Sequence, residues 1–173
     1  ERLNIAAIGS GGKGQVDIDG CESQNIVALC DIDSGRAAHM FNRHTKATKY
    51  ADFRQMLEKE AKRIDAVTVS TPDHTHATAT AMAIRLGKHV YCQKPLTHSV
   101  FEARVLTELA SKHKVATQMG NQGHSNPDSR RYVELIQAGA LGDVKEVHIW
   151  TDRPIWPQGI GRPSGTPPVP KNV

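Results

Sequence analysis

A glycine-rich turn near the start of the chain has the spacing of a phosphate-binding loop. Gly9, Gly11 and Gly14 form the pattern G-x-G-x-x-G directly after the apolar run Leu3–Ile8. In such a turn the first glycine permits a tight bend, the second lets the backbone approach a pyrophosphate, and the third lets the next helix pack on the strand. The free N–H groups and the helix dipole then hold the phosphates. The expected contacts are Gly9, Ser10, Gly11, Gly12, Lys13 and Gly14.

An acidic residue ends the next apolar run. Asp31 follows Val27–Cys30, about 20 residues beyond the first glycine. A carboxylate there accepts hydrogen bonds from ribose hydroxyls and repels a 2′-phosphate, so it favours NAD over NADP. Ile32 is expected beside it, and Arg36 either reaches a 2′-phosphate or is a solvated helix residue. The alternative, a glycine loop followed by an acidic helix cap, explains less of the combined spacing.

A polar segment follows the strand-like run Ala66–Ser70. Ligands of open α/β sheets lie beyond the carboxyl ends of the strands, so this segment should face the cofactor. The alternative is that Thr71 and Asp73 cap the next helix. A zinc site formed by His74, His76 and His124 is disfavoured, because two histidines two residues apart do not share a helix face, and we expect no metal. The candidate cofactor contacts are Ser70, Thr71, Pro72, His74 and His76.

Two further polar segments follow strand-like runs. Lys94 lies in Cys92-Gln93-Lys94-Pro95, and in a partly desolvated cleft it could donate or accept a proton at a sugar hydroxyl. The alternative is a surface lysine before a turn. Gln93 and Lys94 are candidate cofactor contacts. Asn121 could contact the nicotinamide end or a polyol, and His124 a substrate, unless they form only a polar loop.

Alternating strands and helices must position these motifs. Strand candidates are Leu3–Ile8, Ile26–Cys30, Thr48–Tyr50, Ala66–Ser70, His89–Cys92, Val115–Gln118 and Val144–Trp150. Helical patterns lie near 12–22, 34–44, 52–61, 74–87, 99–113 and 127–139. The alternation predicts βαβ units in an α/β fold, a doubly wound parallel sheet covered by helices on both faces. Six of the nine prolines follow residue 150, so we expect 151–173 to be irregular.

Composition excludes several other classes of protein. The chain of 173 residues is 38% apolar and 23% charged, with a net charge of +4 and only 5% aromatic residues. The charges are scattered, so we expect neither a nucleic-acid site nor, without a long apolar run, a membrane span. Three cysteines without a C-x-x-C pair make a disulfide framework improbable. Location is not determined: the protein is expected to be soluble, and either cytoplasmic or exported after removal of a leader.

The ordered set of motifs resembles the Gfo/Idh/MocA family of sugar and polyol oxidoreductases across residues 3–150. Besides the glycine turn and the strand end at Asp31, the matching segments are Tyr50–Leu57, Ile64–Val67, Thr71–His76 and Gly87–Leu96. The resemblance implies an NAD(P)-binding Rossmann domain, which we place at 1–143. It also implies a C-terminal α/β substrate domain that mediates homo-oligomer contacts. Only the start of that domain, a strand and a proline-rich loop at 144–173, is expected in this chain.

The resemblance also implies roles for single residues. The family's Glu-Lys-Pro motif matches Gln93-Lys94-Pro95, which makes Lys94 the expected catalytic lysine and a substrate contact. Gln93 replaces the usual carboxylate, so no negative charge is expected there to tune Lys94. Asn121 matches an asparagine near the nicotinamide, and the family's downstream catalytic histidine would lie beyond this chain. The segment Arg153–Gly159 is similar to an active-site loop of some exported members.

These observations predict an NAD(P)-dependent oxidoreductase. It would transfer a hydride between nicotinamide and a hydroxyl-bearing carbon of a sugar or cyclitol, with Lys94 assisting proton transfer. One alternative is a redox-neutral enzyme that keeps NAD bound and cleaves glycosides through a keto-sugar. The other is a non-catalytic NAD-binding protein.

Overall fold

The computed structural model describes residues 1–153, 157, 159–162 and 164–173. The predicted loop Arg153–Gly159 therefore lies partly outside the described residues. The chain forms two compact units, residues 1–121 with 171–173 and residues 122–170. Each unit is described by itself.

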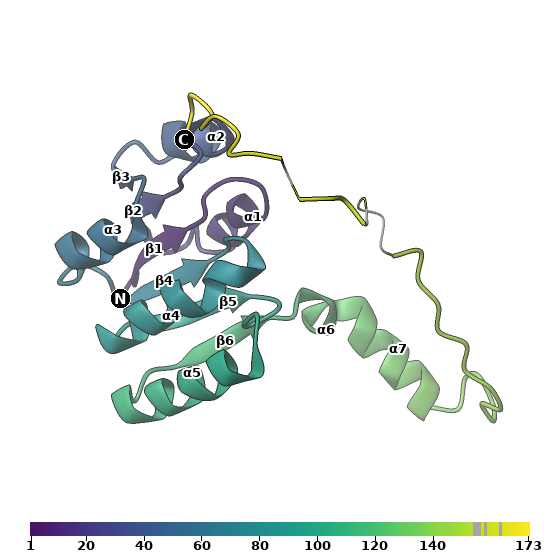
Figure 1. The fold of residues 1–173 in the computed structure, drawn as a ribbon. Helices are drawn as coiled ribbons and strands as arrows, with labels where there is room; N and C mark the ends of the chain where they lie inside the picture. Colours follow the sequence, from purple (N-terminus) through teal and green to yellow (C-terminus); the bar gives the residue numbers. More distant parts are fainter. Residues whose placement is uncertain (154–156, 158, 163) are drawn as a thin grey trace. The chain divides into compact units, whose positions relative to one another are not determined.

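A six-stranded parallel sheet forms the centre of the first unit (Figure 1). The strands are β1 (Asn4–Ile8), β2 (Asn25–Cys30), β3 (Thr48–Tyr50), β4 (Ala66–Val69), β5 (His89–Gln93) and β6 (Thr117–Gly120). Their order in the sheet is β3-β2-β1-β4-β5-β6, and every neighbouring pair is parallel. This is the order of doubly wound dinucleotide-binding folds, so the predicted fold class is confirmed.

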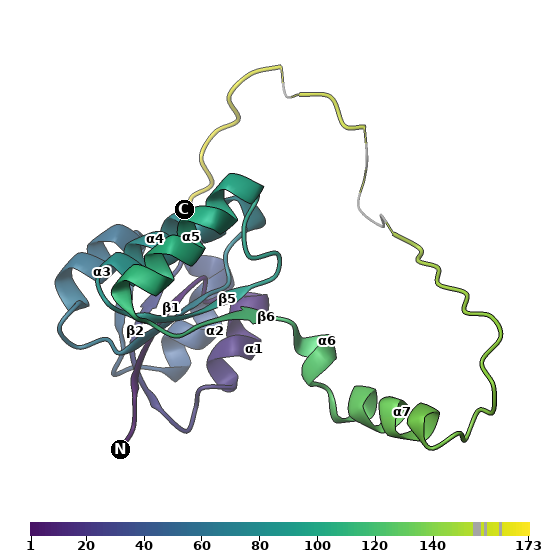
Figure 2. The same ribbon diagram turned by 90° about the horizontal axis from the view of Figure 1, so that it is seen from below.

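Helices cover both faces of the sheet (Figure 2). One face carries α1 (Lys13–Asp19) and α2 (Ser34–Arg43). The other carries α3 (Phe53–Glu60), α4 (His76–Arg85) and α5 (Val100–His113), and a short 3-10 turn, η1 (Asp73–Thr75), precedes α4. Since both faces of the central strands are covered, β1, β2 and β4 read as nearly continuous apolar runs.

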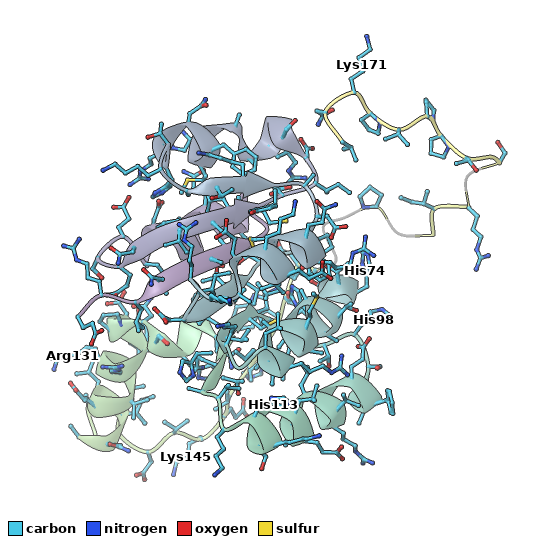
Figure 3. All side chains as sticks on the ribbon, turned by 90° about the vertical axis from the view of Figure 1, so that its left-hand side faces the viewer. His74, His98, His113, Arg131, Lys145 and Lys171 are labelled. Atoms are coloured by element: carbon cyan, nitrogen blue, oxygen red, sulfur yellow. The ribbon has the colours of Figure 1, made fainter. Side chains whose placement is uncertain are left out.

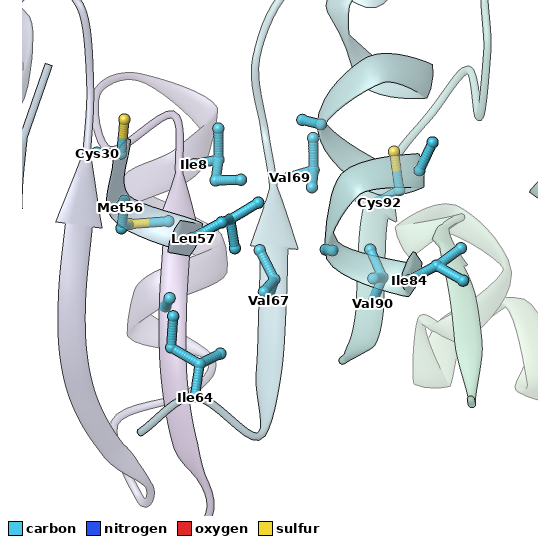
Figure 4. Packing of buried hydrophobic residues seen from close by; sticks show 14 of the residues in the cluster. Ile8, Cys30, Met56, Leu57, Ile64, Val67, Val69, Ile84, Val90 and Cys92 are labelled. Atoms are coloured by element: carbon cyan, nitrogen blue, oxygen red, sulfur yellow. The ribbon is translucent and has the colours of Figure 1, made fainter. Parts of the chain in front are cut away.

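Alternation along the strands divides the core into two layers. In β1, Ala6 and Ile8 join the cluster beneath α3, α4 and α5, whereas Ala7 joins the one beneath α1 and α2. This follows from the two-residue period of a strand. Figure 4 shows the larger cluster, in which Met56 and Leu57 of α3 lie against Ile8. Burying a side chain of this size contributes about 1.5–3 kcal/mol.

Local signals set most element boundaries. The side chain of Asp33 caps α2 and that of Asp52 caps α3, while Ser99 and Glu102 form a capping box at α5. The last strand starts at Thr117, two residues later than predicted. Lys114 ends α5 in the left-handed conformation, with φ 54°, and the chain needs Val115 and Ala116 to reach the sheet.

The second unit contains two helices, α6 (Gln122–Ser125) and α7 (Pro127–Gln137), and α7 has no buried residue. The predicted strand Val144–Trp150 is wrong: these residues have no strand structure. A β-branched run becomes a strand only when a neighbour accepts its backbone hydrogen bonds, and no strand of the described residues pairs with it. The described residues of 151–173 are irregular, as expected.

No helix in the described part of the chain is both long enough and apolar enough to cross a membrane.

Candidate functional site

Strand register places the predicted motifs next to one another at one edge of the sheet. Ile8 pairs with Cys30 on one side and Val69 on the other, so the residues that follow, Gly9, Asp31 and Ser70, are neighbours. In the same way Val69 pairs with Cys92, and Gln93 pairs with Gly120. The predicted adenosine, diphosphate and nicotinamide contacts therefore lie along the carboxyl ends of adjacent strands.

The glycine turn leaves no room for side chains. Gly9 has φ 85°, and a Cβ there would lie 2.7 Å from the carbonyl carbon of Ser70. A Cβ at Gly14 would collide with the carbonyl oxygen of Gly9, so only glycine lets α1 pack this closely on β1. No side chain caps α1, whose first N–H groups, at Gly12 and Lys13, have no acceptor within the helix. This is a cradle suited to a diphosphate.

Asp31 ties the second strand to this turn. Its Oδ2 accepts hydrogen bonds from the N–H groups of Ser10 (2.8 Å) and Gly11 (2.9 Å), and its Oδ1 accepts one from Asp33 (2.9 Å). A carboxylate accepts about four hydrogen bonds, so Asp31 still has capacity for a ribose hydroxyl. The Ser10 side chain instead points inward, is fully buried and donates to the Cys30 carbonyl oxygen.

The other predicted adenosine contacts lie at the start of α2. Ile32 is 65% exposed, and Arg36 is exposed with one guanidinium nitrogen 3.4 Å from where a Cβ of Gly12 would stand. The C-terminal segment is also present here, because Asn172 donates from Nδ2 to Asp33 Oδ1 (2.5 Å) and accepts at its carbonyl from the Ser34 N–H (2.9 Å).

His76 joins two loops of the sheet edge instead of lining the surface. It is 1% exposed, with Nδ1 2.6 Å from the Pro95 carbonyl oxygen and Nε2 2.8 Å from that of Thr71. Two carbonyl acceptors require two N–H donors, which only the charged ring has. Burial lowers the pKa of His76, but its interactions with the Cys92 side chain and the two carbonyl groups outweigh this and raise it to about 9.

The remaining residues of this loop differ in exposure. His74 and Pro72 are exposed (Figure 3 labels His74), while the Thr71 hydroxyl accepts from that of Thr75 (2.7 Å). Both ring nitrogens of His76 are occupied, so it cannot be a zinc ligand in this arrangement. Within the described residues no group of three or more His, Cys, Asp or Glu side chains could hold a metal ion.

Gln93 and Lys94 have opposite environments. Gln93 is 4% exposed and donates from Nε2 to both carboxylate oxygens of Asp17, at 2.9 Å each. Lys94 is exposed, and its peptide bond to Pro95 is cis. Asn121 is exposed directly after β6, and its N–H donates to the Met119 carbonyl oxygen (2.9 Å). His124 belongs to the second unit and is described only there.

Asp17 is the residue that sequence reasoning missed. It lies on α1, and its side chain is 6% exposed. Ser70 donates to it from Oγ (2.7 Å), and Lys13 Nζ is 3.1 Å from it. The signal was indirect: a buried amide at a strand end, such as Gln93, needs an acceptor, and Asp17 is one helical turn after Lys13 on the helix that follows the glycine turn.

Comparisons with known proteins agree with this geometry. The family model described as "Oxidoreductase family, NAD-binding Rossmann fold" (GFO_IDH_MocA) matches residues 3–121. The rhizopine catabolism protein MocA of Rhizobium meliloti is 28% identical over 88% of this chain and 49% of its own length. An inositol 2-dehydrogenase of Rubrobacter xylanophilus is 27% identical over 82% of this chain and 42% of its own.

Solved structures show the same fold. The scyllo-inositol dehydrogenase of Lactobacillus casei, solved with NAD(H) and scyllo-inositol, superposes with a TM-score of 0.72 at 20% identity, covering 83% of this chain and 43% of that one. The chain thus spans about half the length of the relatives that it matches. It belongs to the Gfo/Idh/MocA oxidoreductase family, and its first unit is that family's NAD-binding Rossmann fold.

Proposed function

We propose that the protein is an NAD-dependent oxidoreductase that acts on a hydroxyl-bearing carbon of a cyclitol or related polyol. The observation that carries this proposal is the strand register, which aligns the glycine turn, Asp31 and the Gln93–Lys94 pair along one edge of the sheet. The inositol dehydrogenases among its relatives support the substrate class.

The residues present fit NAD. At Gly9 and Gly14, where a Cβ would collide with neighbouring backbone, the turn and α1 pack closely, and the free N–H groups at the start of α1 are proposed to hold the diphosphate. Asp31 is proposed to accept from the ribose hydroxyls. The negative charge of Asp31 disfavours a 2′-phosphate, and Arg36, whose guanidinium group lies near the turn, could offset this charge. When bound, NAD supplies the hydride acceptor for the alcohol carbon.

Lys94 is the group proposed to move the proton. An exposed side chain directly after β5 can reach a substrate above the sheet edge, and a neutral lysine can accept the hydroxyl proton. His76 joins the loop at Thr71 to the loop at Pro95, the residue directly after Lys94. Asn121, Ser70 and Gln93 are proposed to contact the nicotinamide half. Substrate residues and subunit contacts would come from a second domain, whose start we place at 144–173.

The test measures cofactor binding and turnover separately. Calorimetry with NAD⁺, NADH and NADP⁺ should show binding of both NAD forms and weaker binding of NADP⁺. NADH absorbance is then followed with myo-inositol, scyllo-inositol and glucose, using the wild type and Lys94→Ala in the full-length protein. Lys94→Ala should still bind NAD and should lose turnover. Absence of NAD binding by folded protein would overturn the proposal, and unchanged turnover would overturn the role of Lys94.

A further inference from the structure

A buried carboxylate, that of Asp17, lies beside the carboxyl ends of β4 and β5, and the proposed function does not use it. Asp17 accepts hydrogen bonds from Ser70 and from the amide of Gln93, and it forms an ion pair with Lys13. Its side chain is 6% exposed, whereas that of Lys13 is 42% exposed. Water therefore screens the charge of Lys13 much more than the charge of Asp17.

The hydrogen-bond partners of Asp17 show which half of the sheet its charge lies against. Ser70 follows β4 and Gln93 ends β5, so both belong to the β4–β6 half. A doubly wound sheet binds one mononucleotide with each half. Asp31 belongs to the β1–β3 half and is assigned to the adenosine, which leaves the nicotinamide to the half that holds Asp17.

The hydrogen bonds also fix the amide of Gln93. A carboxylate only accepts, so Nε2 must face Asp17 and Oε1 must face away from it. A second carboxylate in place of Gln93 would stand within hydrogen-bond distance of Asp17, and two like charges at that distance cannot both stay ionised. Residues 17 and 93 are thus matched as one acid and one amide.

We propose that Asp17 is a positioning residue that orients Gln93, and that its charge makes the site prefer oxidised over reduced nicotinamide. The inference rests on the proposed function. The oxidised ring is positively charged and the reduced ring is neutral, so a nearby buried negative charge stabilises only the oxidised form. A buried negative charge near the ring should therefore change the relative binding of the two forms by about tenfold.

The experiment measures the ratio Kd(NADH)/Kd(NAD⁺) by calorimetry on the purified protein. The ratio cancels effects on the diphosphate and adenosine, which the two forms share. Asp17→Asn should lower the ratio about tenfold. The exchange variant Asp17→Asn/Gln93→Glu returns the charge to the pair and should restore the ratio to within about threefold of wild type. A role of Asp17 in stability alone would weaken both forms equally.

Asp19→Asn is the matched control, because it removes the same charge from the same helix where the partner is Arg43. It should leave the ratio unchanged. If Asp17→Asn does not fold, Lys13→Ala removes the cation that pairs with Asp17 and should move the ratio the opposite way. A ratio that stays within twofold of wild type in folded variants would overturn the inference. Failure of wild type to bind either form would instead overturn the proposed function.

Discussion

Asp31 holds the glycine turn and is proposed to bind the ribose, and Asp31→Ala should affect the affinities for NAD⁺ and NADP⁺ differently. Asp31→Ala removes the acceptor of the Ser10 and Gly11 N–H groups and the proposed ribose contact. A hydrogen bond to a charged group contributes about 1.5–3 kcal/mol, so NAD⁺ affinity should fall about 10- to 100-fold. NADP⁺ affinity should fall less, because repulsion of the 2′-phosphate is lost too. Calorimetry with both cofactors measures this, and equal losses would contradict the ribose role.

Asp65→Asn is the control for that experiment. Asp65 accepts from the Asn4 N–H at the amino-terminal edge of the sheet, so its charge lies away from the cofactor edge. Asp65→Asn should leave the affinities for NAD⁺ and NADP⁺ within twofold of the wild-type values.

His76 should make stability depend on pH. Its folded pKa of about 9 exceeds the ordinary 6.5, so its contribution is fully present below pH 6.5 and is lost as the pH rises through about 9. The lost stability is on the order of 3 kcal/mol, at about 1.4 kcal/mol per pKa unit. Urea unfolding across this range should show the decline in wild type and a flatter profile in His76→Asn.

The exposed His98 provides the comparison, since His98→Asn should keep the wild-type slope. Burial raises the pKa of the Cys30 thiol to about 12, so this thiol also favours the folded state at neutral to acidic pH. Its contribution is the same in all three proteins and cancels in the difference. Identical slopes in wild type and His76→Asn would show that the ring is not charged in the folded protein.

At the scale of elements, the packing of α1 on β1 depends on one glycine. In Gly14→Ala the new methyl group meets the Gly9 carbonyl oxygen, so α1 must move away from the strand. We expect a loss of about 1–3 kcal/mol in the free energy of unfolding and a larger loss of NAD affinity, because the cradle widens. Gly20→Ala at the end of the same helix meets only ordinary contacts, the nearest at 3.4 Å. It should change neither quantity, and similar effects in both variants would contradict the prediction.

The elements that the sequence predicts well are those set by local signals. The glycine turn, Asp33 at the start of α2 and the apolar runs of β1 and β4 each act within a few residues, and all the predicted strands of residues 1–121 are present. The cluster around Asp17 could not be predicted, because its four members come from three segments that meet only when β4 pairs with β5 and α1 packs on the sheet. Val144–Trp150 shows the converse: strand propensity without a partner strand makes no strand.

At the scale of the whole molecule, the first unit should be able to fold alone. Every predicted cofactor contact lies in residues 1–121, and within the described part of 122–170 no side chain is buried. The contacts of Asn172 with α2 are exposed and contribute little. A fragment ending at Asn121 should therefore unfold within about 4 °C of the full chain, a change of about 1 kcal/mol.

NAD⁺ should stabilise the fragment and the full chain alike. A ligand at 100 times its Kd adds about 2.7 kcal/mol, which raises the Tm of a domain of this size by roughly 5–10 °C. Differential scanning fluorimetry with NAD⁺ and NADP⁺ measures both proteins in one experiment, and Asp31→Ala in the fragment should abolish most of the shift. A folded fragment without a shift, beside a full chain that has one, would assign part of the cofactor site to residues 122–173. The predicted domain boundary after residue 143 would then describe the binding unit better than the compact unit does.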